Sequence, residues 1–253
     1  MTASTPGFPT WVDLGTADLE GARRFYSALF GWGFEDDGAY TTFLLNGRPV
    51  AGAGPLYDAG QPTAWSTYIA TDDADAVAAR VAANGGKVLV PPFDVHDQGR
   101  MAAFLDPGGA PFSVWQAGTM YGAELFDVPG SLTWNELNAR DLEGAHAFYG
   151  AVFGWQFRHS SIGDMPYLVA KRNETPICGI QPMTAENWPA DVSPHWMVYF
   201  AVHDCDRSAQ HALALGGRVL FPPASLQFGR YAVLTDPQGG MFAVLASHRR
   251  HSA

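Results

Sequence analysis

Two carboxylates occupy equivalent places in the chain and are the first candidates for chemistry. Asp13 follows Trp11 by two residues, and Glu136 follows Trp134 by two. Side chains two apart in a strand face the same side, so each carboxylate is expected beside an indole. A carboxylate in such apolar surroundings is suited to act as a general base, or as a hydrogen-bond anchor for a ligand.

Both carboxylates also have a purely structural interpretation. Each could cap a loop or pair with an arginine, such as Arg100 or Arg230, which are equivalent to one another. The aromatic residues of the same strands are open to two interpretations as well, as core residues or as the walls of a flat apolar slot. These aromatic candidates are Trp11, Tyr68, Trp115, Trp134 and Tyr199.

Two histidines stand where they could take part in catalysis or binding. His96 lies in the loop sequence D-V-H-D-Q-G-R just before an expected strand, where acidic neighbours favour a proton shuttle. His195 directly precedes an expected strand of the second half. The chain has no G-x-S-x-G, P-loop or H-E-x-x-H motif, and its Gly-Gly pairs are typical of helix ends. No standard nucleophile or phosphate site is therefore expected.

These candidates recur because the chain is duplicated. Residues 10–34 and 133–157 are identical at fifteen of 25 aligned positions, and a repeat at a fixed offset indicates repeated structural units. We therefore expect two domains joined by an apolar connector that packs on the body through Leu125, Phe126 and Val128. The predicted boundaries are 1–118 for the first domain, 119–130 for the connector, 131–247 for the second domain and 248–253 for a tail.

Each half reads as a strand, a helix and three strands, twice over. Residues 19–30 have apolar side chains at three- and four-residue spacing, with Asp18 as the expected start and Gly31 as the expected end of a helix. The second half repeats this order with longer loops around 159–166 and 184–195, and residues 1–9 are expected to fray. The sequence thus predicts four βαβββ modules of an α+β fold.

The motifs resemble those of one known superfamily. D-L-E-x-A-x-x-F-Y, then F-G-W, then G-G-x-V followed by Pro-Pro, and a closing D-P-x-G turn occur in order in both halves. This set resembles the vicinal oxygen chelate superfamily of glyoxalase, bleomycin-resistance and extradiol-dioxygenase-like proteins, and within it the actinobacterial two-domain hydroxylase- or glyoxalase-like proteins. The resemblance implies cup-shaped, open β-barrels with the helices packed outside and the ligand inside the cup.

The resemblance also implies three metal-ligand positions in each half. In this chain they hold Trp11, Ser66 and Ser113 in the first half, and Trp134, Met197 and Ala243 in the second. A divalent ion needs about three converging nitrogen or oxygen ligands, and none of these side chains is a good one. We therefore expect no metal and no other cofactor. The expected ligand-lining residues are Trp11, Ser66, Tyr68, Ser113, Trp115, Trp134, His195, Met197 and Tyr199.

Composition narrows the partners. The 253 residues carry a formal net charge of −10, which gives no electrostatic footprint for nucleic acid or an anionic membrane. The start of the chain lacks a signal pattern, so a cytoplasmic location is expected, with Cys178 and Cys205 as buried free thiols. The expected partner is a small molecule, and the chain is expected to be a monomer with an internal pseudo-dimer or a homodimer.

Three functions are compatible with these residues. The favoured one is metal-independent binding, or sequestering, of an aromatic, hydrophobic small molecule in a cup. The first alternative is a cofactor-free enzyme of hydroxylase, isomerase or lyase type that modifies an aromatic metabolite, with Asp13 or Glu136 handling the proton and His96 as a further candidate. The second alternative is a metal-dependent, glyoxalase- or dioxygenase-like enzyme with a displaced site, in which a carboxylate joins His96 or His195.

Overall fold

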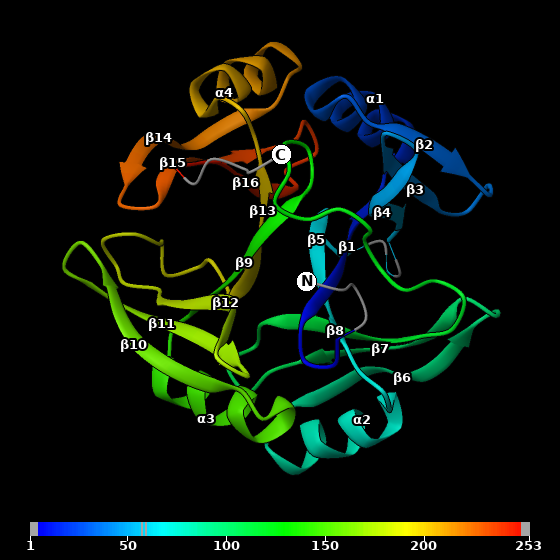
Figure 1. The fold of residues 1–253 in the computed structure, drawn as a ribbon, viewed down its shortest axis with the longest axis vertical. Coiled ribbons are helices and arrows are strands. Elements are labelled where there is room, and N and C mark those ends of the chain that lie inside the picture. Colours follow the sequence, from blue (N-terminus) through cyan, green and yellow to red (C-terminus); the bar gives the residue numbers. More distant parts are fainter. Residues whose placement is uncertain (1–4, 57, 59, 249–253) are drawn as a thin grey trace. The chain divides into compact units, whose positions relative to one another are not determined.

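The computed structural model describes residues 5–56, 58 and 60–248. It confirms the α+β class: each half of the chain forms one eight-stranded, curled sheet with helices outside it (Figure 1). The elements of the first half are β1 (Pro9–Thr16), α1 (Leu19–Phe30), β2 (Gly33–Asp36), β3 (Thr41–Leu45), β4 (Arg48–Pro55), β5 (Ala64–Ala70), α2 (Ala74–Ala83), β6 (Lys87–Val95), β7 (Gly99–Leu105) and β8 (Pro111–Ala117).

The second half repeats this order. Its elements are β9 (Leu132–Ala139), α3 (Leu142–Phe153), β10 (Gln156–Ile162), β11 (Met165–Arg172), β12 (Thr175–Pro182), β13 (His195–Ala201), α4 (Cys205–Ala214), β14 (Arg218–Leu226), β15 (Gly229–Thr235) and β16 (Met241–Ser247). The strand orders are β2-β3-β4-β1-β5-β8-β7-β6 and β10-β11-β12-β9-β13-β16-β15-β14. In each module the first strand pairs in parallel with the last, and the hairpins are antiparallel.

Helices α1 and α3 begin and end at the residues that the sequence predicts. The carboxylate of Asp18 accepts from the Gly21 backbone N–H at 2.8 Å, and Gly31 ends α1 in the left-handed conformation with φ of 72°. Asp141 and Gly154 do the same for α3. These caps satisfy backbone groups that the helix itself cannot pair, and they place the aromatic face of each helix on its sheet.

Packing divides the chain differently from the sheets. One compact unit contains residues up to 11, 67–122 and 134–196, and the other contains 12–66, 123–133 and 197 onward. Each unit therefore combines one module from each half. Within the first unit α2 contacts α3, and within the second α1 contacts α4 (Figure 1). Each unit has its own apolar core.

A buried hydrogen-bond chain fastens the two modules of each unit. In the second unit Tyr26 donates to Asp236 Oδ2 at 3.0 Å and accepts from the indole of Trp65 at 3.0 Å. The first unit has the equivalent chain of Tyr149, Asp106 and Trp196. Burial raises the pKa of both tyrosines well above its usual value, so both phenols stay protonated donors. The repeated F-Y and D-P motifs therefore have a structural role.

Several sequence-based expectations are corrected. Residues 7–9 are not frayed, because the Gly7 backbone N–H donates to the Ala70 carbonyl at 2.8 Å and β1 begins at Pro9. The expected loop at 159–166 is mostly β-structure, since β10 and β11 pair along their whole length and turn at Gly163. Residues 1–4 and 249–253 lie outside the described residues.

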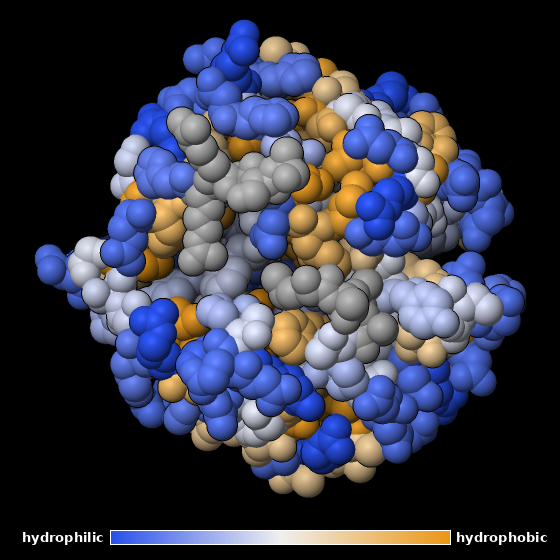
Figure 2. Space-filling model, in the orientation of Figure 1, coloured by the Kyte–Doolittle hydropathy of each residue, from blue (hydrophilic) through white to orange (hydrophobic). Residues whose placement is uncertain are grey.

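The expectations for the two cysteines and for the connector are confirmed. Cys178 and Cys205 are both free and buried. Leu125 and Phe126 of the connector pack against the core of the second unit. No helix in the described ranges is long and apolar enough to cross a membrane, the longest having 12 residues. Many hydrophilic residues are visible on the face drawn in Figure 2.

Candidate ligand-binding site

The first unit holds a short hydrogen-bond chain that ends on the predicted carboxylate Glu136. The Tyr167 hydroxyl donates to Glu136 Oε2 at 2.8 Å and accepts from Trp134 Nε1 at 3.0 Å. Glu136 is 4% exposed. Burial, followed by the charge of Glu136, raises the pKa of Tyr167 well above its usual value, so the phenol is a neutral donor to a buried carboxylate.

A glycine makes this contact possible. Tyr167 is on β11 and Glu136 on β9, and β12 lies between these strands. Gly179 of β12 is in register with Glu136, and a Cβ at Gly179 would lie 1.7 Å from the Tyr167 hydroxyl oxygen. The tyrosine therefore crosses the middle strand through the space that a side chain would otherwise fill.

The second unit contains the same arrangement from the first half of the chain. Tyr40 donates to Asp13 Oδ2 at 3.2 Å. Gly52 of β4 is in register with Asp13, and a Cβ there would lie 1.8 Å from the Tyr40 hydroxyl oxygen. The duplication has thus preserved a three-strand carboxylate–glycine–tyrosine arrangement, which we call the acid–tyrosine pair.

The two acid–tyrosine pairs differ in exposure. Glu136 and Tyr167 are buried, whereas Asp13 and Tyr40 are both partly exposed. A shorter hydrogen bond accompanies the buried pair. Since a group must be reached from outside to meet a ligand, the first-half pair is the better placed of the two for binding.

The predicted arginine partners of these carboxylates are wrong. Arg100 pairs with Asp75 and Asp94 at 2.8 Å each. Arg230 pairs with Asp206. Each arginine joins the first turn of the helix of its own module to the neighbouring strand, and tyrosine takes the place beside Asp13 and Glu136.

The remaining predicted residues lie on the strands as expected but differ in their surroundings. Tyr68 and Ser113 are direct neighbours on β5 and β8, as Tyr199 and Ala243 are on β13 and β16. Trp115 donates from its indole to the Met120 carbonyl at 2.8 Å. Six of the predicted ligand-lining residues are at most 7% exposed: Trp11, Tyr68, Ser113, Trp115, Met197 and Tyr199. Ser66 and Trp134 are partly exposed.

The two candidate histidines have different environments. His96 is exposed at the β6–β7 hairpin with φ of 48°. His195 contacts Trp188 edge to face at 4.7 Å, and its Nδ1 lies 2.9 Å from the Ser193 carbonyl oxygen. Among the described residues, its buried Nε2 has no hydrogen-bond partner. Burial, with a smaller effect from Arg140, lowers the pKa of His195 below its usual value, so the neutral ring is favoured.

The donor chemistry does not fit the metal that the superfamily resemblance implies. Indole, thioether and methyl groups at Trp11, Trp134, Met197 and Ala243 offer no hard donor, and Ser66 and Ser113 offer only hydroxyls. In the described part of the chain, no three or more His, Cys, Asp or Glu side chains group so that they could hold an ion. The displaced-site alternative therefore has no cluster to support it there.

Sequence reasoning missed the tyrosines and the glycines. Tyr40 and Tyr167 stand 127 residues apart, the offset that relates this part of the two halves, as do Gly52 and Gly179. That equivalence was the available signal. Their role depends on strand register, which the sequence does not state directly.

Comparison with known proteins agrees with this fold. Residues 9–114 match the Glyoxalase/Bleomycin resistance protein/Dioxygenase superfamily, and residues 134–245 match a family described as a glyoxalase-like domain. The chain belongs to this superfamily, the vicinal oxygen chelate proteins.

Relatives with similar sequences span the whole chain. "Putative glyoxylase CFP32" of Mycobacterium bovis is 43% identical over 94% of both chains. "Anthracycline biosynthesis protein DnrV" of Streptomyces peucetius is 42% identical and covers 97% of this chain and 95% of its own. "Anthracycline biosynthesis protein DauV" of Streptomyces sp. strain C5 is 40% identical over 100% of this chain and 98% of its own.

Solved structures show the fold alone. The Mn(II)-bound glyoxalase from Novosphingobium aromaticivorans aligns with a TM-score of 0.67 at 18% identity, covering 95% of this chain and 82% of that one. The 2,3-dioxygenase LapB from Pseudomonas sp. KL28 aligns with a TM-score of 0.65 at 14% identity, covering 97% and 95%.

Proposed function

We propose that this protein binds an aromatic, hydrophobic small molecule without a metal, and that the Asp13–Tyr40 pair is its polar anchor. One observation carries the proposal: the same acid–tyrosine pair occurs in both halves, but it is partly exposed only in the first. The buried pair of Glu136 and Tyr167 then serves stability. The partly exposed ring of Tyr40 beside this carboxylate offers apolar contact area next to the polar anchor.

The chemistry of the pair favours a hydroxylated or quinone-like ligand. A carboxylate has about four acceptor positions, and the Tyr40 hydroxyl uses one of those on Asp13. A phenolic hydroxyl of a ligand can donate to another. Relatives named anthracycline biosynthesis proteins, 42% and 40% identical over nearly the whole chain, support a fused-ring aromatic ligand of that class.

Equilibrium binding tests this proposal. An anthracyclinone, the fused-ring hydroxyquinone without its sugar, is titrated into the protein and followed by tryptophan fluorescence and calorimetry. We expect saturable binding that Asp13→Asn weakens by roughly 10-fold or more, the range of a hydrogen bond to a charged group. Glu136→Gln is the matched control, expected to change Kd by less than about twofold because the buried pair meets no ligand.

Two results would overturn the proposal. One is the absence of saturable binding to folded protein. The other is the reverse pattern, in which Glu136→Gln abolishes binding and Asp13→Asn leaves it intact. Far-UV circular dichroism and the urea midpoint of each variant separate lost binding from lost structure.

A cofactor-free enzyme is the second candidate function, and the acid–tyrosine pair also favours it. A carboxylate beside a tyrosine can accept a proton from a bound substrate while the tyrosine hydroxyl keeps the carboxylate in place. Two of the three relatives are named for biosynthesis, which is in keeping with turnover. Mass spectrometry of the same incubations distinguishes the two: a product that forms with the wild type and not with Asp13→Asn establishes the enzyme. Elemental analysis of protein purified without chelator tests the displaced metal site.

A further inference from the structure

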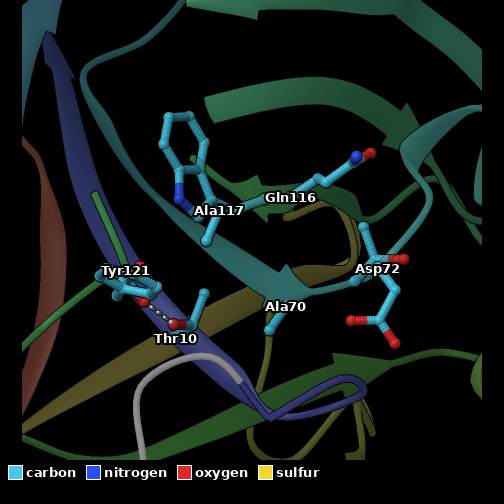
Figure 3. A pocket seen from close by; sticks show the side chains of 8 residues that line it. Thr10, Ala70, Asp72, Gln116, Ala117 and Tyr121 are labelled. Atoms are coloured by element: carbon cyan, nitrogen blue, oxygen red, sulfur yellow. Dashed lines mark hydrogen bonds between the residues drawn. The ribbon is translucent and has the colours of Figure 1, made fainter. Parts of the chain in front are cut away.

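The first compact unit has a cavity whose lining includes no residue of the acid–tyrosine pairs. The cavity has a volume of about 270 Å³, slightly below the roughly 300–1,000 Å³ of sites for drug-sized ligands. Its lining residues are Thr10, Ala70, Thr71, Asp72, Trp115, Gln116, Ala117 and Tyr121, of which only Trp115 was a predicted site residue (Figure 3). The size indicates a small ligand rather than a fused-ring one.

Hydrogen bonds hold the indole of Trp115 and the backbone of Tyr121 in place beside this cavity. Trp115 Nε1 donates to the Met120 carbonyl at 2.8 Å. The Thr10 hydroxyl donates to the Tyr121 carbonyl at 3.2 Å (Figure 3). Gly122, at φ of 105°, lets the chain pass so close to Thr10 that a Cβ would lie 2.3 Å from its hydroxyl oxygen. Tyr121 is nevertheless 62% exposed, so a fixed backbone presents a phenol ring to solvent at the cavity.

The charge at this cavity is negative and uncompensated. Asp72 is exposed, and it has no hydrogen-bond or ion-pair partner among the residues that the structure describes. Arg100, in register with Gln116 on the neighbouring strand, is already engaged by Asp75 and Asp94. A guest in the cavity therefore meets one carboxylate and two aromatic rings, with no opposing cation in the lining.

We propose that this cavity binds a small organic ammonium ion, through the ring faces of Trp115 and Tyr121 and the carboxylate of Asp72. Aromatic faces attract ammonium groups through the ring quadrupole, most strongly when quaternary groups are enclosed by several rings. The carboxylate adds attraction that salt weakens. This site does not depend on the proposed function at Asp13, and either can fail without the other.

The test compares choline with 3,3-dimethylbutan-1-ol, which has the same shape and no charge. Both are titrated into ¹⁵N-labelled full-length protein while the indole N–H signal of Trp115, assigned with Trp115→Phe, is followed. We expect choline to shift this signal to saturation in the millimolar range. The alcohol should bind at least about threefold more weakly, because it lacks the cation–π attraction.

Variants make the result specific. Tyr121→Ala and Asp72→Asn should each weaken choline binding roughly two- to fivefold, and Asp72→Asn should also reduce its dependence on salt. Asp164→Asn removes the same charge from the β10–β11 hairpin, outside the cavity, and should leave choline affinity unchanged. Equal affinity for the two probes, no effect of Asp72→Asn, or no shift of the Trp115 signal by choline would each overturn the proposal.

Discussion

Removing one hydroxyl group from each acid–tyrosine pair tests the difference in burial between them. The substitutions are Tyr167→Phe and Tyr40→Phe, which delete the equivalent oxygen in the two halves and leave the rings in place. Tyr121→Phe is the control, because Tyr121 is 62% exposed and its hydrogen bond within the described part of the chain is made by the backbone carbonyl. The three variants change nothing but one oxygen each.

The expected magnitudes follow from the surroundings of each oxygen. Tyr167 donates at 2.8 Å to a carboxylate that is 4% exposed, and a hydrogen bond to a charged group contributes about 1.5–3 kcal/mol. Tyr40 donates at 3.2 Å to partly exposed Asp13, where water can replace the hydroxyl, so its loss should cost about 0.5 kcal/mol. Tyr121→Phe should stay within about 0.5 kcal/mol of the wild type.

Equilibrium unfolding in urea at pH 7, followed by circular dichroism, measures these differences. With an m value of about 3 kcal/mol/M, a loss of about 2 kcal/mol lowers the midpoint by roughly 0.7 M for Tyr167→Phe. The midpoint of Tyr40→Phe should fall by less than a third of that. Equal destabilisation by the two variants, or a larger effect of Tyr40→Phe, would refute the reasoning that the second-half pair is the structural one.

Two further predictions concern the second half. Because burial lowers the pKa of His195 below its ordinary 6.5, the unfolded chain binds this proton more readily than the folded one, so the free energy of unfolding should fall as pH drops through and below 6.5. His195→Gln should flatten that slope between pH 7.5 and 5.5 in urea titrations, and an unchanged slope would contradict the assignment. Gly179→Ala should destabilise the protein by at least about 2 kcal/mol, since its Cβ would lie 1.7 Å from the Tyr167 hydroxyl oxygen. Gly33→Ala, with nothing within 4 Å of its Cβ, is the matched control and should be close to neutral by the same measurement.

The sequence by itself predicts the architecture because the signals involved are local. The repeat of residues 10–34 at 133–157 is visible by comparing the two stretches of sequence. Within it, Asp18 and Gly31 mark the start and end of one helix, and each acts within a few residues. Backbone hydrogen-bonding needs and apolar periodicity make such features visible in a short stretch of sequence, without knowledge of long-range contacts. The two carboxylates, Asp13 and Glu136, were recognisable as candidates for the same reason, since strand alternation places them beside a tryptophan.

Only the tertiary structure decides what those carboxylates touch. Tyr167 meets Glu136 across an intervening strand, at a point where Gly179 leaves room, and this depends on the register of three strands. Arg100 and Arg230, the partners expected from the sequence, instead pair with aspartates on the helices of their own modules. Charge and spacing along the chain cannot tell whether an arginine or a tyrosine will contact a given carboxylate. The contact depends on which side chains are buried together, and on where a glycine in an intervening strand leaves room for them.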